Sequence, residues 1–301
     1  MPSDTLASDI AEIRCSYVRD RFAFVPSAKM VRIVRDLGAT DEDLDRLRTI
    51  GDTLESDPTL PFRKTRTGRF GFDPVAMEVR RLEFQPFMLS TEDDFVRHDA
   101  GQVRIFDEIR DDLQLNTALQ ALFVFKFLVF DGMKVEQRPK LDYDSDRWVC
   151  TLLNVRTITD GDLIGEPALE GVHSDGVDHT MTTYLGSENM TEDSAVTFLH
   201  EMDEVNGARW HDTNPELVRA RAQHREFLDT CLIVDHELKH SVSTLRAVDP
   251  DRPATRDLLA FLTRRPVAED HHSHEFDSPA PHPAMPMTVP LRTLDGTVPT
   301  G

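Results

Sequence analysis

A mainly β fold with flanking helices, an α+β arrangement, is predicted by a change of pattern near residue 140 of the 301-residue chain. Before that point apolar residues recur at helical spacing. After it, short apolar segments follow one another, separated by Gly, Asp, Asn and Pro, which is typical of an antiparallel β unit. Together the two patterns favour a double-stranded β-helix, the jelly-roll or cupin-like core, covered on one outer face by the N-terminal helices.

Two helices are predicted in the first half of the chain. The first has apolar residues at three- and four-residue steps, namely Leu44, Leu47, Ile50 and Leu54. Thr40 and Asp43 precede this pattern as capping candidates. The second helix is expected over 103–122, where Val, Ile and Leu recur, and its end is lost in the aromatic run near Phe130. Both helices are expected to lie against the sheet.

Six strands are predicted in the second half, at 148–157, 179–186, 194–202, 227–235, 240–248 and 256–263. We therefore expect one domain over 1–264, with a helix-rich part at 1–140 and the jelly-roll core at 141–264. The remaining residues, 265–301, are rich in Pro and His, which predicts an extended or partly disordered tail. Its histidines, His271, His272 and His274, are interpreted as part of a polar tail without a rigid scaffold.

The composition excludes several classes of function. A formal charge of −20 argues against binding to nucleic-acid phosphates, which requires Lys and Arg. No apolar run reaches the roughly 20 residues of a membrane helix, and the first residues lack a secretory pattern, so a cytoplasmic protein is expected. The three cysteines, Cys15, Cys150 and Cys231, are interpreted as reduced thiols. The densest basic run, 63–69, is either a solvated turn or a contact for an anionic substrate.

A His and an Asp two positions apart, His173 and Asp175, stand in a segment interpreted as the entry to a strand, where alternation places both on one face. Such a pair can occupy two corners of the facial triad that holds non-haem Fe(II). His240, at the start of a later strand, is the candidate for the third corner. His236 competes with it but lies in a charged turn. His179 and His200 are interpreted as ordinary strand histidines.

Arg256 follows the second histidine, in the last predicted strand, where a guanidinium can bind a carboxylate through both oxygens. Two His and one carboxylate also suit zinc, so a non-redox zinc or nickel cupin, acting as hydrolase, isomerase or sensor, is the alternative. Arg256 favours the iron site, because it has no obvious role unless a carboxylate is held beside the metal.

These residues resemble a known family. The segments 154–156, 170–176 and 235–242, together with Arg256 and the Asp57-Pro58 and Arg63 stretch, are similar to bacterial Fe(II)/2-oxoglutarate-dependent dioxygenases that hydroxylate free amino acids, the L-isoleucine dioxygenase type. The resemblance covers roughly residues 20 to 264. It departs from the family at 191–194, where relatives often have a Gly-Gly pair, and at Leu169, which stands where relatives have Pro.

The resemblance implies a function and its site. His173, Asp175 and His240 would bind Fe(II), and Arg256 would pair with the distal carboxylate of 2-oxoglutarate. With O2 as second co-substrate, the enzyme would hydroxylate an unactivated carbon of a free L-amino acid and release succinate and CO2. A carboxylate at Asp175 favours hydroxylation over halogenation. Arg156 and Glu170 are reasonable partners for the carboxylate and ammonium of the amino acid. The sequence does not indicate an oligomeric state.

Overall fold

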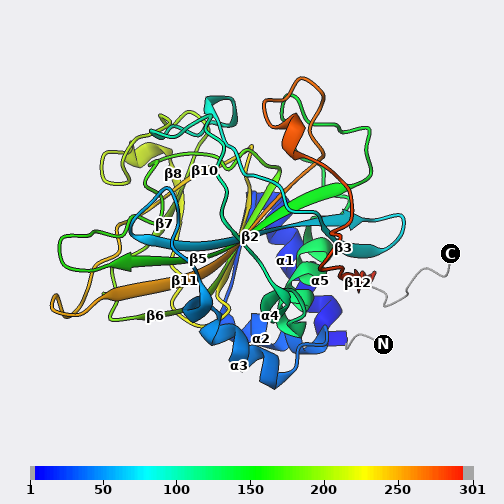
Figure 1. Cartoon of the computed structure of the whole chain (residues 1–301), viewed down its shortest axis with the longest axis horizontal. Helices are drawn as coiled ribbons and strands as arrows, with labels where there is room; N and C mark the ends of the chain where they lie inside the picture. The colour runs from blue at the N-terminus through cyan, green and yellow to red at the C-terminus, as the bar shows by residue number, and fades with distance from the viewer. Residues whose placement is uncertain (1–3, 294–301) are drawn as a thin grey trace.

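The computed structural model describes residues 4–293, which form two β-sheets and a layer of helices (Figure 1). In their order across the large sheet, its strands are β1 (Phe22–Val25), β9 (Thr230–Val234), β6 (His179–Glu188), β11 (Ala254–Arg264), β5 (Trp148–Thr159), β2 (Arg63–Asp73), β3 (Glu78–Leu82) and β12 (Thr288–Pro290), and β4 (Asp107–Glu108) pairs in parallel with β2. The small sheet has the order β10 (Lys239–Val242), β7 (Thr197–His200), β8 (Val218–Ala222). Apolar residues of β7, β8 and β9 pack together and join the two sheets.

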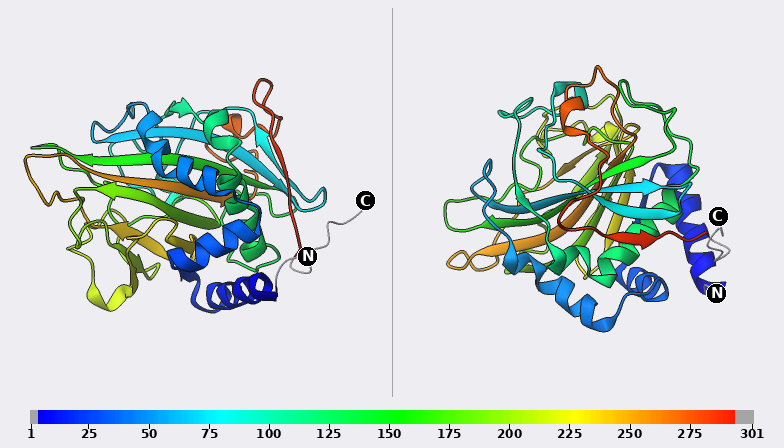
Figure 2. Two further views of the ribbon diagram at one scale, coloured as in Figure 1. Left: turned by 90° about the horizontal axis from the view of Figure 1, so that it is seen from below. Right: turned by 45° about the vertical axis from the view of Figure 1, so that its right-hand side comes forward.

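The helices cover one face of the large sheet, as Figure 2 shows. They are α1 (Asp4–Asp20), α2 (Ser27–Asp36), α3 (Asp41–Thr49), α4 (Asp111–Gln114) and α5 (Thr117–Phe130), and four short 3-10 turns lie at Ile50–Thr53, Thr91–Asp93, Pro215–Leu217 and His274–Phe276. The central helix is α5, which is apolar on all sides and almost wholly buried. Its Phe123 packs on Phe70 and Phe72 of β2. This confirms the predicted mainly β fold with helices on one face.

Lys126 is the exception in the apolar helix α5. Its Nζ donates to the backbone oxygens of His179 in β6, at 2.9 Å, and Phe261 in β11, at 2.6 Å. Burial lowers the pKa of this ammonium to about 8, because no carboxylate contacts it within the described chain. The lysine thus ties α5 to two central strands, while the folded state carries the cost of a buried charge.

Alternation along the central strands divides the sheet into two environments. On β5 and β11, Leu152 and Phe261 point to the helices and join the main core. Leu153 and Leu262 point to the other face, where they form a small apolar cluster with Val177. The face turned toward the small sheet also lines a cavity.

The six predicted strands correspond to β5, β6, β7, β9, β10 and β11, and the predicted cap is confirmed because the Thr40 side chain accepts from the Asp43 amide. The helix predicted over 103–122 is right only in part, because 111–114 belong to α4 and 117–122 to α5, whereas 103–110 are not helical. Val103 and Ile105 lie exposed in an irregular segment, and Asn116 caps a new helix that runs from Thr117 to Phe130. Capping by Asn116 therefore sets where α5 begins, and of the apolar residues upstream of it Ile109 and Leu113 are buried in the core.

The basic run 63–69 is neither a turn nor solvated. It forms the start of β2, a strand bordered by β5 and β3, and Arg66 and Arg69 are buried. Arg66 pairs with Asp107 and Asp112, and Arg69 pairs with Asp277. Carboxylates from distant segments neutralise these arginines, which the local sequence cannot show. Arg63 alone among the arginines of β2 lines the cavity.

The predicted tail packs against the rest of the protein over the residues described, 265–293 (Figure 1). Thr288–Pro290 pairs with β3 as an edge strand, where the missing Pro amide costs no ladder bond. The side chain of Asp277 is 4% exposed and accepts hydrogen bonds from Arg69 and Arg264. The tail is thus extended but anchored, and the boundary at residue 264 stays a prediction. Among residues 4–293, no helix is long and apolar enough to cross a membrane.

Candidate active site

His173, Asp175 and His240 converge on one point of the structure. Their ligand atoms, two imidazole nitrogens and a carboxylate oxygen, all lie within 4.8 Å of one another. His240 belongs to β10, whereas His173 and Asp175 lie in the irregular segment before β6 and not in the strand that the sequence suggested. The two histidines still pair through their backbones, because each amide donates to the carbonyl of the other, at 3.0 and 2.9 Å.

Glycines shape the segment that carries the first two residues. Gly171 and Gly176 have φ of +77° and +73°, a left-handed conformation that disfavours a side chain. A Cβ on Gly171 would lie 2.5 Å from the carbonyl oxygen of Ala208. The chain can therefore make its close approach around His173 only with glycine at this position.

The three side chains fit a metal ion. Asp175 Oδ1 lies 3.5 Å from His173 Nε2, and Oδ2 lies 3.7 Å from His240 Nε2. Ligands at about 2.1 Å and right angles on one face of an octahedral ion are about 3 Å apart, so a small contraction brings all three into place. Two imidazoles and one carboxylate are the donor set of the non-haem Fe(II) triad.

A buried carboxylate, Asp235, supports this arrangement from behind. Its Oδ2 accepts from the backbone amides of Asp175, at 2.8 Å, and Val177, at 3.3 Å. Its Oδ1 lies 3.9 Å from His240 Nδ1. On the other side, Thr180 Oγ1 donates to Asp175 Oδ2 at 2.8 Å. Such outer contacts orient metal-binding side chains, and sequence reasoning missed Asp235 because it lay unremarked in the turn beside His236.

The charges around the three residues favour a cation. Burial lowers the pKa of His173, but the carboxylates of Glu170 and Asp175 outweigh it and raise that pKa to about 9. Burial alone would raise the pKa of Asp175. The nearby His240 and His173 outweigh this effect, so the pKa of Asp175 is lowered. Burial and His173 lower the pKa of His240 to about 4. Burial and Asp175 raise the pKa of Asp235. Carboxylates thus dominate the centre, and a divalent cation would relieve their repulsion.

A cavity opens beside the three residues, between the two sheets. Its walls come from β5, β10 and β11 and from an irregular segment between β3 and β4. The apolar lining residues include Phe87, Phe95, Phe106, Leu153, Val155, Val242, Leu258, Ala260 and Leu262, and the charged ones are Arg63, Arg97, Arg104, Glu170, Asp175 and Arg256. The candidate metal centre therefore faces a mostly apolar chamber that contains several guanidinium groups.

Arg256 lies on the inner face of β11 and lines this cavity. It is 4% exposed, and its Nε has no hydrogen-bond partner among residues 4–293. Burial lowers its pKa to about 10, with Tyr184 and Asp257 opposing the effect, so the group stays charged at neutral pH. A buried guanidinium without a carboxylate partner is costly, which makes it a suitable site for an anionic ligand.

Comparison with known proteins identifies the family. A family model described as 2OG-Fe dioxygenase matches residues 48–262. The chain belongs to the 2OG-Fe dioxygenases. The Fe(II)/(alpha)ketoglutarate-dependent dioxygenase TqaL is 49% identical, with a TM-score of 0.82, over 96% of this chain and 98% of TqaL. A bsmA homolog from Methylobium petroleophilum PM1 shares the fold at 18% identity and a TM-score of 0.68, over 85% of this chain and 93% of that one.

The bifunctional enzyme flvA of Aspergillus flavus is 43% identical over 284 residues, which are 94% of this chain and 34% of flvA. The dioxygenase chain thus spans about a third of the length of that relative. Members of the 2OG-Fe family use Fe(II), 2-oxoglutarate and O2, and the three ligand atoms of this dioxygenase can hold the metal. The family assignment decides against the zinc or nickel cupin.

The structure does not support the predicted substrate role of Arg156. Its side chain points to the helix-covered face of β5, where Asp257 accepts two hydrogen bonds from it, both at 2.6 Å. Asp52 lies 2.8 Å from the same guanidinium. Arg156 is one position from Thr157, which lines the cavity, so alternation along the strand places the arginine on the wrong face. Glu170, by contrast, lines the cavity of the dioxygenase, with Oε1 3.2 Å from His173 Nε2.

The other histidines lie outside the candidate metal centre. His236 stands in the turn between β9 and β10 and is not one of the three clustered ligands. His179 is buried on the helix side, where its Nδ1 contacts the Tyr17 hydroxyl at 3.0 Å and its ring packs on Phe130. It is therefore a core residue. His200 contacts Ser241 Oγ at 2.9 Å.

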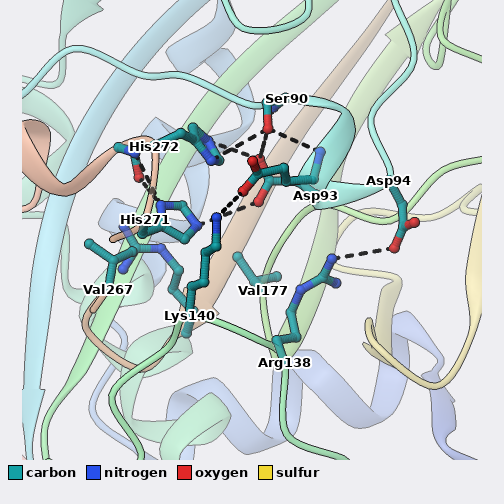
Figure 3. A network of polar contacts seen from close by, with 12 residues as sticks. Ser90, Asp93, Asp94, Arg138, Lys140, Val177, Val267, His271 and His272 are labelled. Carbon is teal, nitrogen blue, oxygen red and sulfur yellow. Dashed lines mark hydrogen bonds and ion pairs between the residues drawn. The ribbon is translucent and has the colours of Figure 1, made fainter. Parts of the chain in front are cut away.

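The tail histidines have partners that sequence reasoning did not foresee. His271 and His272 both face Asp93, with nitrogen-to-oxygen distances of 3.7 and 3.0 Å (Figure 3). His271 Nδ1 accepts from the Ser273 amide, at 3.1 Å, while its Nε2 faces Asp93. The contacts of His271 and His272 with Asp93 therefore join the tail to the segment that precedes Phe95, whereas the sequence predicted a free polar tail.

Proposed function

We propose that this dioxygenase hydroxylates an unactivated carbon of a free L-amino acid, or a close derivative, with release of succinate and CO2. The observation that carries the proposal is that the three clustered ligands and the buried Arg256 line the same cavity. A 2-oxo acid that chelates a metal at the triad needs a cation for its far carboxylate, and Arg256 supplies one. The resemblance to amino-acid hydroxylases supports the substrate class.

Each residue then has a role. His173, Asp175 and His240 would hold Fe(II), because two His and one carboxylate are the donor set of the non-haem Fe(II) oxygenases. Bound iron supplies the oxidative chemistry of the family. Asp235 holds the backbone at Asp175 and Val177 in place by accepting a hydrogen bond from the amide of each. The side chains of the protein orient the two organic substrates and exclude water.

The cavity walls support a substrate with an aliphatic part. Leu153, Val155, Leu258 and Ala260 come from neighbouring strands and make a surface without hydrogen-bonding groups. Such a surface favours a hydrocarbon side chain near the metal. Glu170, beside His173, is the proposed partner of the substrate ammonium.

The test begins with anaerobic addition of Fe(II) and 2-oxoglutarate to the protein. We expect the weak visible charge-transfer band of the chelate, and its absence would overturn the proposed cofactor site. The second step adds O2 and, one at a time, each of the free L-amino acids that occur in proteins, and the rate of succinate release is measured. We expect at least one amino acid to accelerate succinate release and to gain one oxygen atom, as measured by mass spectrometry. If the band forms and no amino acid accelerates turnover, the substrate class is wrong.

A further inference from the structure

The segment between β3 and β4, residues 83–106, brings six side chains to the cavity that sequence reasoning missed, among them Leu89 and Phe106. Phe87, Phe95, Arg97 and Arg104 all line it. The segment is irregular, but it is fixed where Phe87 and Arg104 exchange backbone hydrogen bonds of 2.8 and 2.9 Å. These two hydrogen bonds therefore fix the backbone at Arg104, from which its side chain extends into the cavity.

Arg104 is a buried cation that has no carboxylate in contact among the residues the structure describes. It is 4% exposed, and its Nε and Nη2 have no hydrogen-bond partner within residues 4–293. Its guanidinium lies over the rings of Phe87 and Phe95, at 4.9 and 5.2 Å from their centroids. Burial, and then Arg97, lower its pKa to about 10, which leaves it charged at neutral pH. Ring faces attract the cation but do not satisfy its donors.

The neighbouring arginines differ, because each has its own carboxylate. Arg97 donates to both oxygens of Asp99, at 2.6 and 2.7 Å. Arg63 donates from Nε to Asp57 at 2.7 Å. Of the three guanidinium groups on this side of the cavity, Arg104 thus has the most unused donors for a ligand.

Aromatic contacts place Arg104 close to the candidate metal centre. The Phe95 ring that lies under its guanidinium also meets the His173 ring edge-on, with centroids 6.4 Å apart and an angle of 84°. The Phe95 ring therefore contacts both the Arg104 guanidinium and His173, a proposed iron ligand. Arg97 Nη1 lies 3.7 Å from Glu170 Oε2, so a carboxylate and two guanidinium groups meet in this part of the cavity.

We propose that Arg104 binds the carboxylate of the substrate, with Arg97 adding positive charge and Glu170 facing the substrate ammonium. This rests on the proposed function and narrows it to amino acids with a free carboxylate. Arg256 serves the other anion, 2-oxoglutarate, from β11. A substrate amide or ester would leave the Arg104 donors unpaired, and such buried unpaired donors give strong discrimination.

The experiment compares amino acids with their primary carboxamides. Succinate release is measured for the Fe(II)-loaded enzyme with 2-oxoglutarate, O2 and each compound. We expect acceleration by an amino acid and not by its amide. Arg104→Gln should raise the KM for that amino acid about 10- to 150-fold, the effect of losing a hydrogen bond to a charged group. The Kd for 2-oxoglutarate, read from the visible band, should not change, and this band also shows that the variant is folded.

The control is Arg46→Gln, since Arg46 is an exposed arginine of α3 paired with Glu42, and it should behave as the wild type. If Arg104→Gln does not fold, Arg104→Lys is tested in its place. Lysine keeps the positive charge but lacks the paired donors of the guanidinium, so it should raise the same KM to a smaller extent. An unchanged KM, an equal rise for 2-oxoglutarate, or acceleration by the amide would overturn the role of Arg104. A visible band with no acceleration by any amino acid would overturn the proposed function, and the assignment of Arg104 with it.

Discussion

Replacement of Arg256 by lysine tests the proposed co-substrate site. Arg256 is buried, and its Nε has no partner in the described part of the protein, so the substitution removes few contacts from the folded chain. The loss should therefore fall on ligand binding and not on stability. Lysine keeps the positive charge but loses one of the two parallel hydrogen bonds to the distal carboxylate of 2-oxoglutarate.

The magnitude follows from that single lost bond. A hydrogen bond to a charged group contributes about 1.5 to 3 kcal/mol, which corresponds to a rise of about 10- to 150-fold in the Kd for 2-oxoglutarate. The KM for the amino acid should change much less, because Arg104 and not Arg256 is proposed to bind it. The assay titrates each substrate separately and adds the visible band as a direct measure of 2-oxoglutarate binding, since KM equals Kd only when chemistry is slow.

The matched control is Arg264→Lys, eight positions further along β11. Arg264 donates to Asp277 at 2.9 and 3.0 Å and is not among the residues that line the cavity. We expect normal 2-oxoglutarate binding in this variant. An unchanged constant for 2-oxoglutarate in Arg256→Lys, or an equal rise for both substrates, would refute the reasoning and make Arg256 a structural residue.

Three further predictions concern the metal centre and the core. His240→Ala should abolish succinate release and the visible band while His236→Ala keeps both, because only His240 joins the clustered ligands; the opposite pattern would show that the wrong histidine was chosen. Asp175→Gly should abolish hydroxylation, and any remaining substrate oxidation should depend on chloride, which product analysis with and without chloride measures; full hydroxylation by this variant would contradict the role of the carboxylate. The third prediction is a pH effect of Lys126, whose folded pKa of about 8 is below the unfolded value of about 10.4. The unfolded chain binds more protons between these values, so stability rises with pH there, by roughly 2 to 3 kcal/mol from pH 7 to pH 10. Lys126→Met should lack this rise in urea unfolding, and equal pH dependence in the two proteins would contradict the assignment.

The sequence by itself determined the local features of the protein. Alternation and turn residues located the main strands, because the side-chain period of a strand is local. The His173 and Asp175 pair and the distal His240 were also visible, since a metal centre of this kind needs those residue types on neighbouring strands or loops. Arg256 was a candidate because it follows them in the last predicted strand.

Tertiary structure decided everything that depends on partners distant in the sequence. Alternation shows that Arg156 and Thr157 face opposite sides of β5, but only the packing of helices on one side shows which of them lines the cavity. The segment 83–106 has no regular pattern, so nothing in the local sequence indicates that Arg104 is buried. Nor does it indicate that the Phe95 ring contacts both the Arg104 guanidinium and the His173 ring. The Pro-rich tail is held by the pairing of Asp277 with Arg69 and Arg264, and by the contacts of its histidines with Asp93. Charges find their partners only when the chain has folded, because ion pairing depends on distance in space and not along the sequence.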